Sequence, residues 1–218
     1  MKLIVLVLAR GGSKRLKKKN ILKLNKKPLL TWTLKFAKKL PYITNILVST
    51  DDKKIARIAK LNKAYVPWLR PKFLSGDDVA SSKAAVHAIK WYEKNVEKID
   101  GILLLQPTSP FRNFKTIKKI ISLFKKNYQK NYVSVSESKF RNINFSKKNK
   151  VMIPYSNKKN KFLKYYKPNG SFYLISPQQL IKYKTFITKR AIGVLIKNEK
   201  EQIDINYKSD FKYAKQFI

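Results

Sequence analysis

The sequence predicts an α/β protein with a mostly parallel, Rossmann-like sheet that carries helices on both faces. Two observations support this fold class. Short apolar runs of the kind found in buried strands alternate with amphipathic stretches of helical spacing. Polar clusters containing glycine or proline directly follow several of the apolar runs. Parallel strands are buried on both faces and return through helices, so this alternation is what such a sheet requires.

The first half of the chain contains two strand–helix pairs and a further helix. Residues 3–9 are apolar and stop at Arg10 and a glycine pair, which predicts a buried strand and not a secretory signal. Residues 29–40 show helical spacing, and residues 45–49 form a second strand before a helix at 53–63. Residues 81–95 place Ala85, Ile89 and Tyr92 roughly on one face, which predicts another helix.

The second half continues the alternation with one interruption. A strand at 101–105 and a helix at 114–127 precede a strand at 132–136. Residues 139–168 are polar and without periodicity, and they are a candidate flap, small subdomain or dimerisation arm within a single domain spanning 1–218. Strands at 172–175 and 191–196 follow, and a closing helix at 209–217 has Ser209 as a candidate N-cap and Asp210 in its first turn.

The composition limits the class of protein. A chain of 218 residues suits one compact domain. No cysteine is present, which excludes disulfides, thiolate nucleophiles and cysteine metal sites. No apolar run reaches the roughly 18 residues that a membrane span needs. We therefore expect a cytoplasmic protein without a membrane partner.

The net charge of +38 has two interpretations. It indicates either a polyanionic partner such as nucleic acid or a compositional drift toward the lysine codons of an AT-rich genome. Only seven of the 50 cations are arginine, and the lysines are spread along the whole chain. Nucleic-acid-binding proteins usually also use arginine for bidentate contacts, so the composition favours the second interpretation, compositional drift toward lysine codons. Under either interpretation the surface attracts anions.

A basic, glycine-containing cluster follows the first predicted strand. Two glycines let the backbone approach a ligand and offer its N–H groups to phosphate oxygens, and the cations can neutralise a triphosphate. The Gly-Lys-Ser/Thr ending of a P-loop is absent. The alternative is a tight turn with solvated lysines. The residues concerned are Arg10, Gly11, Gly12, Ser13, Lys14, Lys19 and Asn20.

Further polar clusters lie at other predicted strand ends, where ligands bind in open parallel sheets. After the second strand, Asp51 either orders the first loop or acts in a metal's outer shell, unless Asp51 or Asp52 only caps a helix. Arg70-Pro71 precedes Ser81, which is also a candidate cap. After Gln106, two prolines bracket Thr108 and Ser109 and make either a rigid loop that can aim Gln106 and the hydroxyls at a ligand or a plain connector.

Two clusters lie in the last third of the chain. Pro168-Asn169-Gly170 before an apolar run is either a ligand-facing turn or a common turn signal. Asp204 and Asn206 alternate on one side of an extended segment, and both carry oxygens that suit Mg²⁺. The alternative is the solvent face of an edge strand. The single histidine, His87, lies within a predicted helix and is expected to be structural.

Taken together and in their order along the chain, these clusters resemble those of the N-acylneuraminate cytidylyltransferase family, which makes CMP-activated sialic, legionaminic or pseudaminic acid. The resemblance runs from Leu8 to Phe211. The motifs that carry it are Ala-Arg-x-x-Ser-Lys followed by Lys-Asn, Arg-Pro with a serine eleven residues on, Leu-Leu-Gln-Pro-Thr-Ser-Pro, and Pro-Asn-Gly. The resemblance implies a nucleotidyltransferase fold, a CTP substrate, an acidic nine-carbon sugar, Mg²⁺ and a homodimer.

The resemblance also implies roles for single residues. The CTP site would include Arg10, Lys14, Lys19 and Asn20, with Arg70 and Ser81 holding the cytidine. Gln106 and Asn169 would face the sugar, and Lys159 would cross from the partner subunit in the arm at 139–168. Asp204 matches the first of two metal-binding aspartates, whereas Asn206 departs from the second and offers only a neutral oxygen.

The implied reaction is direct nucleotidyl transfer, in which the sugar's anomeric hydroxyl attacks the α-phosphorus of CTP and pyrophosphate leaves. Arg10, Lys14 and Lys19 would offset the charge on the phosphates together with Mg²⁺. Three alternatives stay open at this point: a related nucleotidyltransferase with another sugar or nucleotide, a nucleic-acid-binding protein, and a homologue without activity. The sequence does not determine which nonulosonic acid is used.

Overall fold

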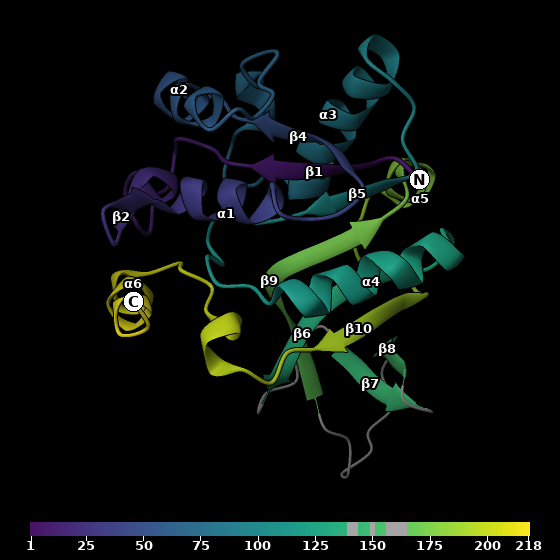
Figure 1. Cartoon of the computed structure of the whole chain (residues 1–218). Coiled ribbons are helices and arrows are strands. Elements are labelled where there is room, and N and C mark those ends of the chain that lie inside the picture. Colours follow the sequence, from purple (N-terminus) through teal and green to yellow (C-terminus); the bar gives the residue numbers. More distant parts are fainter. Residues whose placement is uncertain (139–143, 149–150, 156–164) are drawn as a thin grey trace.

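The computed structural model describes residues 1–138, 144–148, 151–155 and 165–218. An eight-stranded sheet runs through the molecule in the order β4-β1-β5-β9-β6-β10-β8-β7 (Figure 1). Its strands in chain order are β1 (Leu3–Leu8), β4 (Ile43–Ser49), β5 (Gly101–Leu104), β6 (Asn131–Ser138), β7 (Asn144–Lys148), β8 (Val151–Tyr155), β9 (Tyr165–Ile175) and β10 (Ala191–Leu195). A separate two-stranded sheet joins β2 (Lys23–Leu24) to β3 (Lys27–Pro28).

The large sheet is mixed but mostly parallel, which confirms the predicted fold class. Strand β1 lies parallel to both β4 and β5, and β10 lies parallel to β6. Strand β9 is antiparallel to both of its neighbours, β5 and β6. It begins at Tyr165, inside the stretch that showed no periodicity, and β7 and β8 also fall in that stretch. Residues 139–143, 149–150 and 156–164, which include Lys159, lie outside the described residues.

Helices cover both faces of the sheet, as the sequence predicts. One core cluster joins the sheet to α1 (Leu29–Ala37), α2 (Lys53–Leu61) and α4 (Phe114–Lys126). The opposite cluster joins it to α3 (Ser81–Asn95) and α5 (Pro177–Tyr183). The fully buried apolar strands β1 and β5 lie between these two clusters. Helix α5 was not predicted, although Ser176 caps it and Pro177 occupies its first turn.

The last helix, α6 (Lys208–Lys215), begins one residue earlier than predicted, and Ser209 is not its N-cap. Instead, Asp210 Oδ2 accepts the backbone N–H groups of Asn206 and Tyr207, each at 2.8 Å. A carboxylate in the first turn is the charge that a helix N-terminus favours. These bonds hold the extended segment before α6, which carries Asp204 and Asn206, against the helix.

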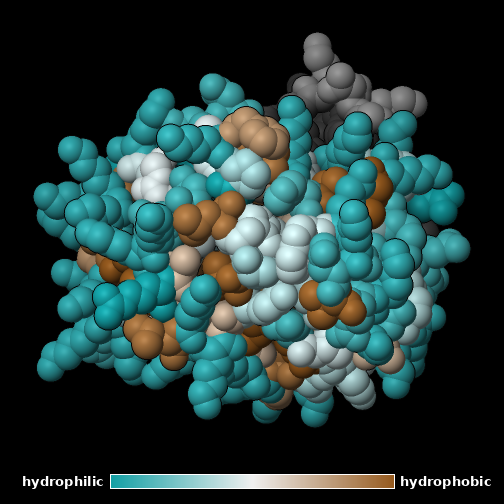
Figure 2. Space-filling view, turned by 90° about the horizontal axis from the view of Figure 1, so that it is seen from above, coloured by the Kyte–Doolittle hydropathy of each residue, from teal (hydrophilic) through white to brown (hydrophobic). Residues whose placement is uncertain are grey.

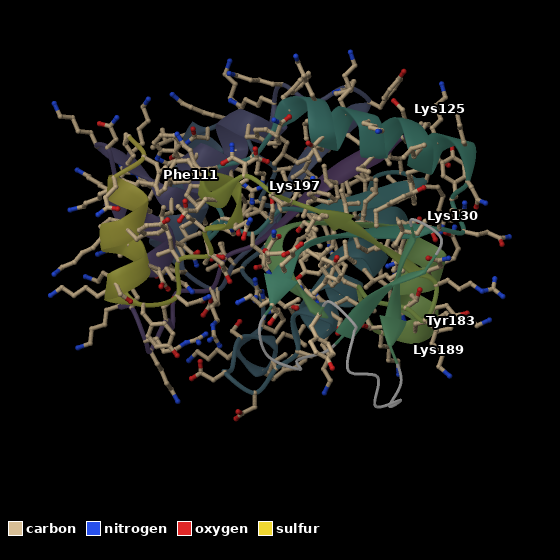
Figure 3. The ribbon with its side chains drawn as sticks, turned by 90° about the horizontal axis from the view of Figure 1, so that it is seen from below. Phe111, Lys125, Lys130, Tyr183, Lys189 and Lys197 are labelled. Carbon is tan, nitrogen blue, oxygen red and sulfur yellow. The ribbon has the colours of Figure 1, made fainter. Side chains whose placement is uncertain are left out.

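A third core cluster attaches this C-terminal segment to the rest of the molecule. Phe111 packs there with Leu24, Ile205 and Ala214, and its ring lies 6.4 Å from that of Phe217 (Figure 3). In Figure 1, α6 and the short sheet of β2 and β3 lie on the side of the molecule to which β1 points. The chain's C-terminal segment is therefore brought to the carboxyl ends of the parallel strands.

The net charge of +38 makes the surface strongly cationic. Figure 2 shows a mostly hydrophilic face with separate small apolar patches. Lysines such as Lys125, Lys130 and Lys189 lie along the outer edge in Figure 3. Within the described ranges, no helix combines the length and hydrophobicity that a bilayer crossing needs.

Candidate active site

A cleft of about 350 Å³ opens at the carboxyl ends of β1 and β5, where open α/β sheets bind ligands. We call it the main cleft. It gathers polar side chains from the loop after β1, the loop before α3 and the loop after β5. Nine predicted site residues line it: Arg10, Ser13, Lys14, Lys19, Asn20, Arg70, Ser81, Gln106 and Asn206.

The loop after β1 is held in shape by side chains from outside it. Asp51 Oδ1 accepts the N–H of Gly11 at 2.9 Å, and Asn20 Nδ2 donates to the carbonyl of Arg10 at 2.9 Å. This confirms that Asp51 orders the first loop, while Asp52 caps α2 through the N–H groups of Lys54 and Ile55. The N–H of Gly11 is consequently engaged within the protein.

The two glycines of this loop differ in their surroundings. A Cβ added at Gly11 would lie 2.7 Å from Asp52 Oδ2, so the close approach of the two loops requires glycine there. A Cβ added at Gly12 would meet no atom within 4 Å. Neither glycine lines the main cleft, unlike the neighbouring Arg10 and Ser13.

Two of the predicted phosphate-binding cations share one carboxylate. Asp77 Oδ1 lies 2.6 Å from Arg10 Nη2, and Asp77 Oδ2 lies 2.8 Å from Lys14 Nζ. Arg10 Nη1 also donates to the carbonyl of Gly76 at 2.9 Å. The hydrogen bond from Lys14, with the charge of Arg10, holds the pKa of Asp77 below its usual range. The loop before α3 thus pairs with the cations of the loop after β1.

Arg70 is buried at the back of the main cleft. Its Nε donates to Ser49 Oγ at 3.0 Å, its Nη2 donates to the Ser49 carbonyl, and its backbone N–H donates to Thr50 at 2.7 Å. Burial lowers the pKa of the Arg70 guanidinium, and the charge of Asp51 partly offsets this. Ser81 begins α3 at the cleft wall, and its side chain makes no capping hydrogen bond.

A row of three side chains crosses from the main cleft to the C-terminal segment. Lys19 Nζ donates to Asn206 Oδ1 at 2.9 Å, and Asn206 Nδ2 donates to Asp204 Oδ2 at 2.7 Å. Burial is the largest influence on Lys19 and lowers its pKa, while the charge of Asp204 raises it. Lys19 is therefore a partly desolvated cation, whose charge acts more strongly on a bound anion than that of a solvated lysine.

A second hollow of about 470 Å³ adjoins the main cleft, and Asn206 lines both. We call it the side hollow. It also contains Asn169 and Asp204, two predicted site residues that do not line the main cleft. Gly170 lies within β9, where the register with β6 shifts, and we call this place the Gly170 turn. Its φ is 79°, and a Cβ there would lie 2.7 Å from Gln106 Oε1 and 3.5 Å from Asp204 Cγ. The Gly170 turn therefore brings Gln106, Asn169 and Asp204 together.

Three buried polar atoms around this turn have no hydrogen-bond partner: Ser109 Oγ, Asn169 Nδ2 and Asp204 Oδ1. Unpaired buried polar atoms are costly, and their concentration at one place indicates a site that a ligand completes. Ser109 is adjacent to the turn, since its Oγ lies 3.2 Å from the Cβ position at Gly170. In the sequence, Ser109 is distinguished only as part of the Leu-Leu-Gln-Pro-Thr-Ser-Pro motif.

Asp204 meets the requirements of a Mg²⁺ ligand more fully than Asn206 does. Mg²⁺ is commonly held by one or two carboxylates together with substrate phosphates. Asp204 Oδ1 is buried and unpartnered, whereas Asn206 Oδ1 already accepts the hydrogen bond from Lys19. No group of three or more potential metal-binding side chains of the His, Cys, Asp or Glu type occurs within the residues described. A metal held here would depend on Asp204 and on the ligand's own oxygens.

Sequence analysis missed two carboxylates that shape the site. Asp77 lies in a polar loop that was noted only for its neighbours Arg70 and Ser81, and its pairing with Arg10 depends on the fold. Asp210 was assigned to a helix turn, yet it also lines the side hollow. The only local signal for Asp77 is the Ser-Gly-Asp-Asp sequence at 75–78.

An α/β sheet with a cationic cleft at its strand ends defines a nucleotide-binding protein of the doubly wound type. The profile of the cytidylyltransferase family matches residues 4–218, which is nearly the whole chain. The protein belongs to the cytidylyltransferase family.

Characterised proteins of similar sequence support this assignment. The chain is 31% identical to the CMP-N,N'-diacetyllegionaminic acid synthase of Legionella pneumophila, over 100% of this chain and 97% of that protein. It is 30% identical to a pseudaminic acid cytidylyltransferase of Campylobacter jejuni, over 99% and 95% of the two chains. It is also 30% identical to an N-acylneuraminate cytidylyltransferase of Escherichia coli, over 98% of this chain and 51% of that protein.

Solved structures share the fold. CMP:2-keto-3-deoxy-manno-octonic acid synthetase complexed with CTP superposes with a TM-score of 0.72 at 14% identity, covering 100% of this chain and 98% of the other. A cytidylyltransferase from Leptospira borgpetersenii superposes with a TM-score of 0.64 at 19% identity, covering 99% and 85%. At these identities the likeness concerns the fold alone.

Proposed function

We propose that this protein transfers CMP from CTP to the anomeric hydroxyl of an acidic nine-carbon sugar of the sialic, legionaminic or pseudaminic type. The observation that carries the proposal is the row Lys19–Asn206–Asp204, which joins a cation-lined cleft to a second hollow with unpaired polar atoms. Two adjoining cavities suit a two-substrate transfer. The sequence relatives, named for three such sugars, support this substrate class.

In this proposal CTP occupies the main cleft. Its triphosphate lies against Arg10, Lys14 and Lys19, and its cytidine lies toward Arg70 and Ser81. These cations offset the charge that develops as pyrophosphate departs. A Mg²⁺ ion, if held by Asp204 and the phosphates, would supply further Lewis-acid stabilisation.

The sugar occupies the side hollow, with Asn169 facing it and Gln106 reaching toward it from the main cleft at the Gly170 turn. Asn169 is 5% exposed, and its unpartnered Nδ2 is a donor suited to a sugar hydroxyl or carboxylate. Lys19 lies at the junction of the two cavities, where the sugar hydroxyl would attack the α-phosphorus in line with the leaving pyrophosphate. Holding both reactants in this geometry is the main source of rate in such a reaction. The homodimer and the role of Lys159 remain predictions.

The test is pyrophosphate release from CTP with a panel of sialic, legionaminic and pseudaminic acids, with Kdo as the eight-carbon comparison and UTP, GTP and ATP as alternative donors. We expect turnover with CTP and at least one nine-carbon acid. Lys19→Ala should lower turnover about 100-fold, as the loss of one preorganised charged donor typically does. Lys17→Ala is the matched control, because Lys17 is an exposed lysine of the same loop that does not line the main cleft.

Two results would contradict the proposal. The first is a folded sample that binds no CTP with or without Mg²⁺. The second is a Lys19→Ala variant with the turnover of the parent protein. A nucleic-acid-binding protein would instead show tight gel-shift complexes in moderate salt without releasing pyrophosphate from CTP.

A further inference from the structure

Arg112 lies behind the loop that follows β5 and joins three separate segments of the chain. Its Nη2 donates to the carbonyl of Gln106 at 2.6 Å, and its Nε donates to the carbonyl of Ser171 at 2.8 Å. Its Nη1 donates to Thr33 Oγ1 in α1 at 3.2 Å. Arg112 lines neither the main cleft nor the side hollow. Arg112 can therefore act on the site only through the backbone carbonyls that it holds.

Arg112 is a half-buried cation whose hydrogen-bond acceptors carry no charge. None of the ion pairs formed within the described segments includes it, and all three of its acceptors are neutral. Burial lowers the pKa of its guanidinium to about 9, while the charge of Asp204 raises it. The side chain still carries its charge at neutral pH. Keeping a charge in this environment is costly unless its hydrogen bonds serve the fold or the site.

The two carbonyls that Arg112 holds belong to the two segments whose side chains face the sugar in the proposed function. Gln106 is held at its own carbonyl. Ser171 follows Gly170 and lies two residues after Asn169, and the N–H of Ser171 donates to Asn169 Oδ1 at 3.2 Å. Across the Gly170 turn, the Gln106 side chain packs so closely that a Cβ added at Gly170 would lie 2.7 Å from Gln106 Oε1, so a small shift of either segment alters this packing.

We propose that Arg112 is a positioning residue that fixes the distance between Gln106 and Asn169 and thereby sets how the sugar acceptor fits, without contributing to CTP binding. This inference rests on the proposed function. A guanidinium is suited to the role because its planar fork donates in several fixed directions at once. A lysine at the same position offers a point charge that cannot hold two carbonyls in one geometry.

The experiment compares Arg112→Lys, Arg112→Gln and Gln106→Ala in the full chain, using the acceptor that the parent protein turns over. For both Arg112 variants we expect kcat/KM for the acceptor to fall about 10- to 100-fold, the cost of displacing a positioned group by up to an ångström. The Kd for CTP, measured by calorimetry, should not change. Arg57→Gln is the matched control, since Arg57 is an exposed arginine of α2 that lines neither cavity.

A double-mutant cycle separates positioning from general destabilisation. If Arg112 acts through Gln106, the losses in Arg112→Gln and Gln106→Ala are strongly non-additive, whereas Arg112→Gln combined with Ser81→Ala on the cytidine side gives additive losses. Equal losses for CTP and acceptor, additive losses with Gln106→Ala, or failure of both Arg112 variants to fold would each overturn the proposal. An inactive parent protein would instead overturn the proposed function.

Discussion

Replacing Gly170 with alanine tests the geometry of the junction between the two cavities. Gly170 is the only glycine with a positive φ among the described residues, at 79°. A left-handed conformation costs an L-residue about 1–2 kcal/mol. For a protein of this size, each kcal/mol shifts Tm by about 2–4 °C. We therefore expect Gly170→Ala to lower Tm by about 2–8 °C in calorimetry or thermal-shift measurements.

The same substitution should also alter the acceptor site. The new Cβ would lie 2.7 Å from Gln106 Oε1, whereas ordinary contact begins at 3.4 Å. Gln106 must therefore move by a large fraction of an ångström, and its flexible side chain can do so without unfolding the protein. A displacement of this size corresponds to about a tenfold or greater loss in kcat/KM for the acceptor. The Kd for CTP should stay near that of the parent protein, because Gly170 does not line the main cleft, in which Arg70 and Ser81 lie.

Gly12→Ala is the matched control for this prediction. Gly12 belongs to the loop after β1, has no positive φ, and has no atom within 4 Å of its Cβ position. Gly12→Ala should leave Tm, the Kd for CTP and kcat/KM for the acceptor unchanged. A Gly170→Ala variant with the stability and the acceptor kinetics of the parent protein would refute the proposed contact between the turn and Gln106.

Three further outcomes are expected. Burial lowers the pKa of Lys19, so its ammonium loses its proton at a lower pH than an exposed lysine does. CTP binding should therefore weaken as pH rises into the alkaline range, and Lys19→Arg should abolish this alkaline limb; an unchanged limb in that variant would assign the titration to another group. Asp77→Asn should tighten CTP binding about two- to fivefold at low salt, because it frees Arg10 and Lys14 from a competing carboxylate. Weaker binding would show that Asp77 instead orders these cations for CTP. Excess EDTA should abolish turnover, and Asp204→Asn should raise the Mg²⁺ concentration that gives half-maximal activity; full activity in EDTA would exclude the metal.

The sequence was sufficient to predict the strands and helices that build the sheet. The runs that became β1, β4 and β5 are apolar and short, and the residues of α2 and α4 have clear helical periodicity. Such patterns are local, because each depends only on residues within one element. For the same reason, Asp51 after β4 could be expected to order the loop after β1, since parallel strands bring their carboxyl ends to one edge.

Local patterns failed where neighbours in space are distant in sequence. Strand β9 starts in a segment without periodicity. Its residues pair with three strands, β5, β6 and β7, so they lack the simple alternation of buried and exposed side chains that marks a half-exposed strand. Likewise, Ser209 resembled a cap, but Asp210 reaches back to the N–H groups before α6. In both cases the local structure depends on which backbone groups the tertiary structure leaves without a hydrogen-bond partner.

By itself, the sequence determined the fold class and singled out eleven of the residues that line the two cavities, because apolar spacing and strand-end position are properties of short segments. Only the tertiary structure decided how those residues connect. Lys19 meets Asn206 across 187 positions, and Arg112 reaches Ser171 across 59. Such contacts depend on strand order and on the antiparallel insertion of β9, which no local pattern encodes.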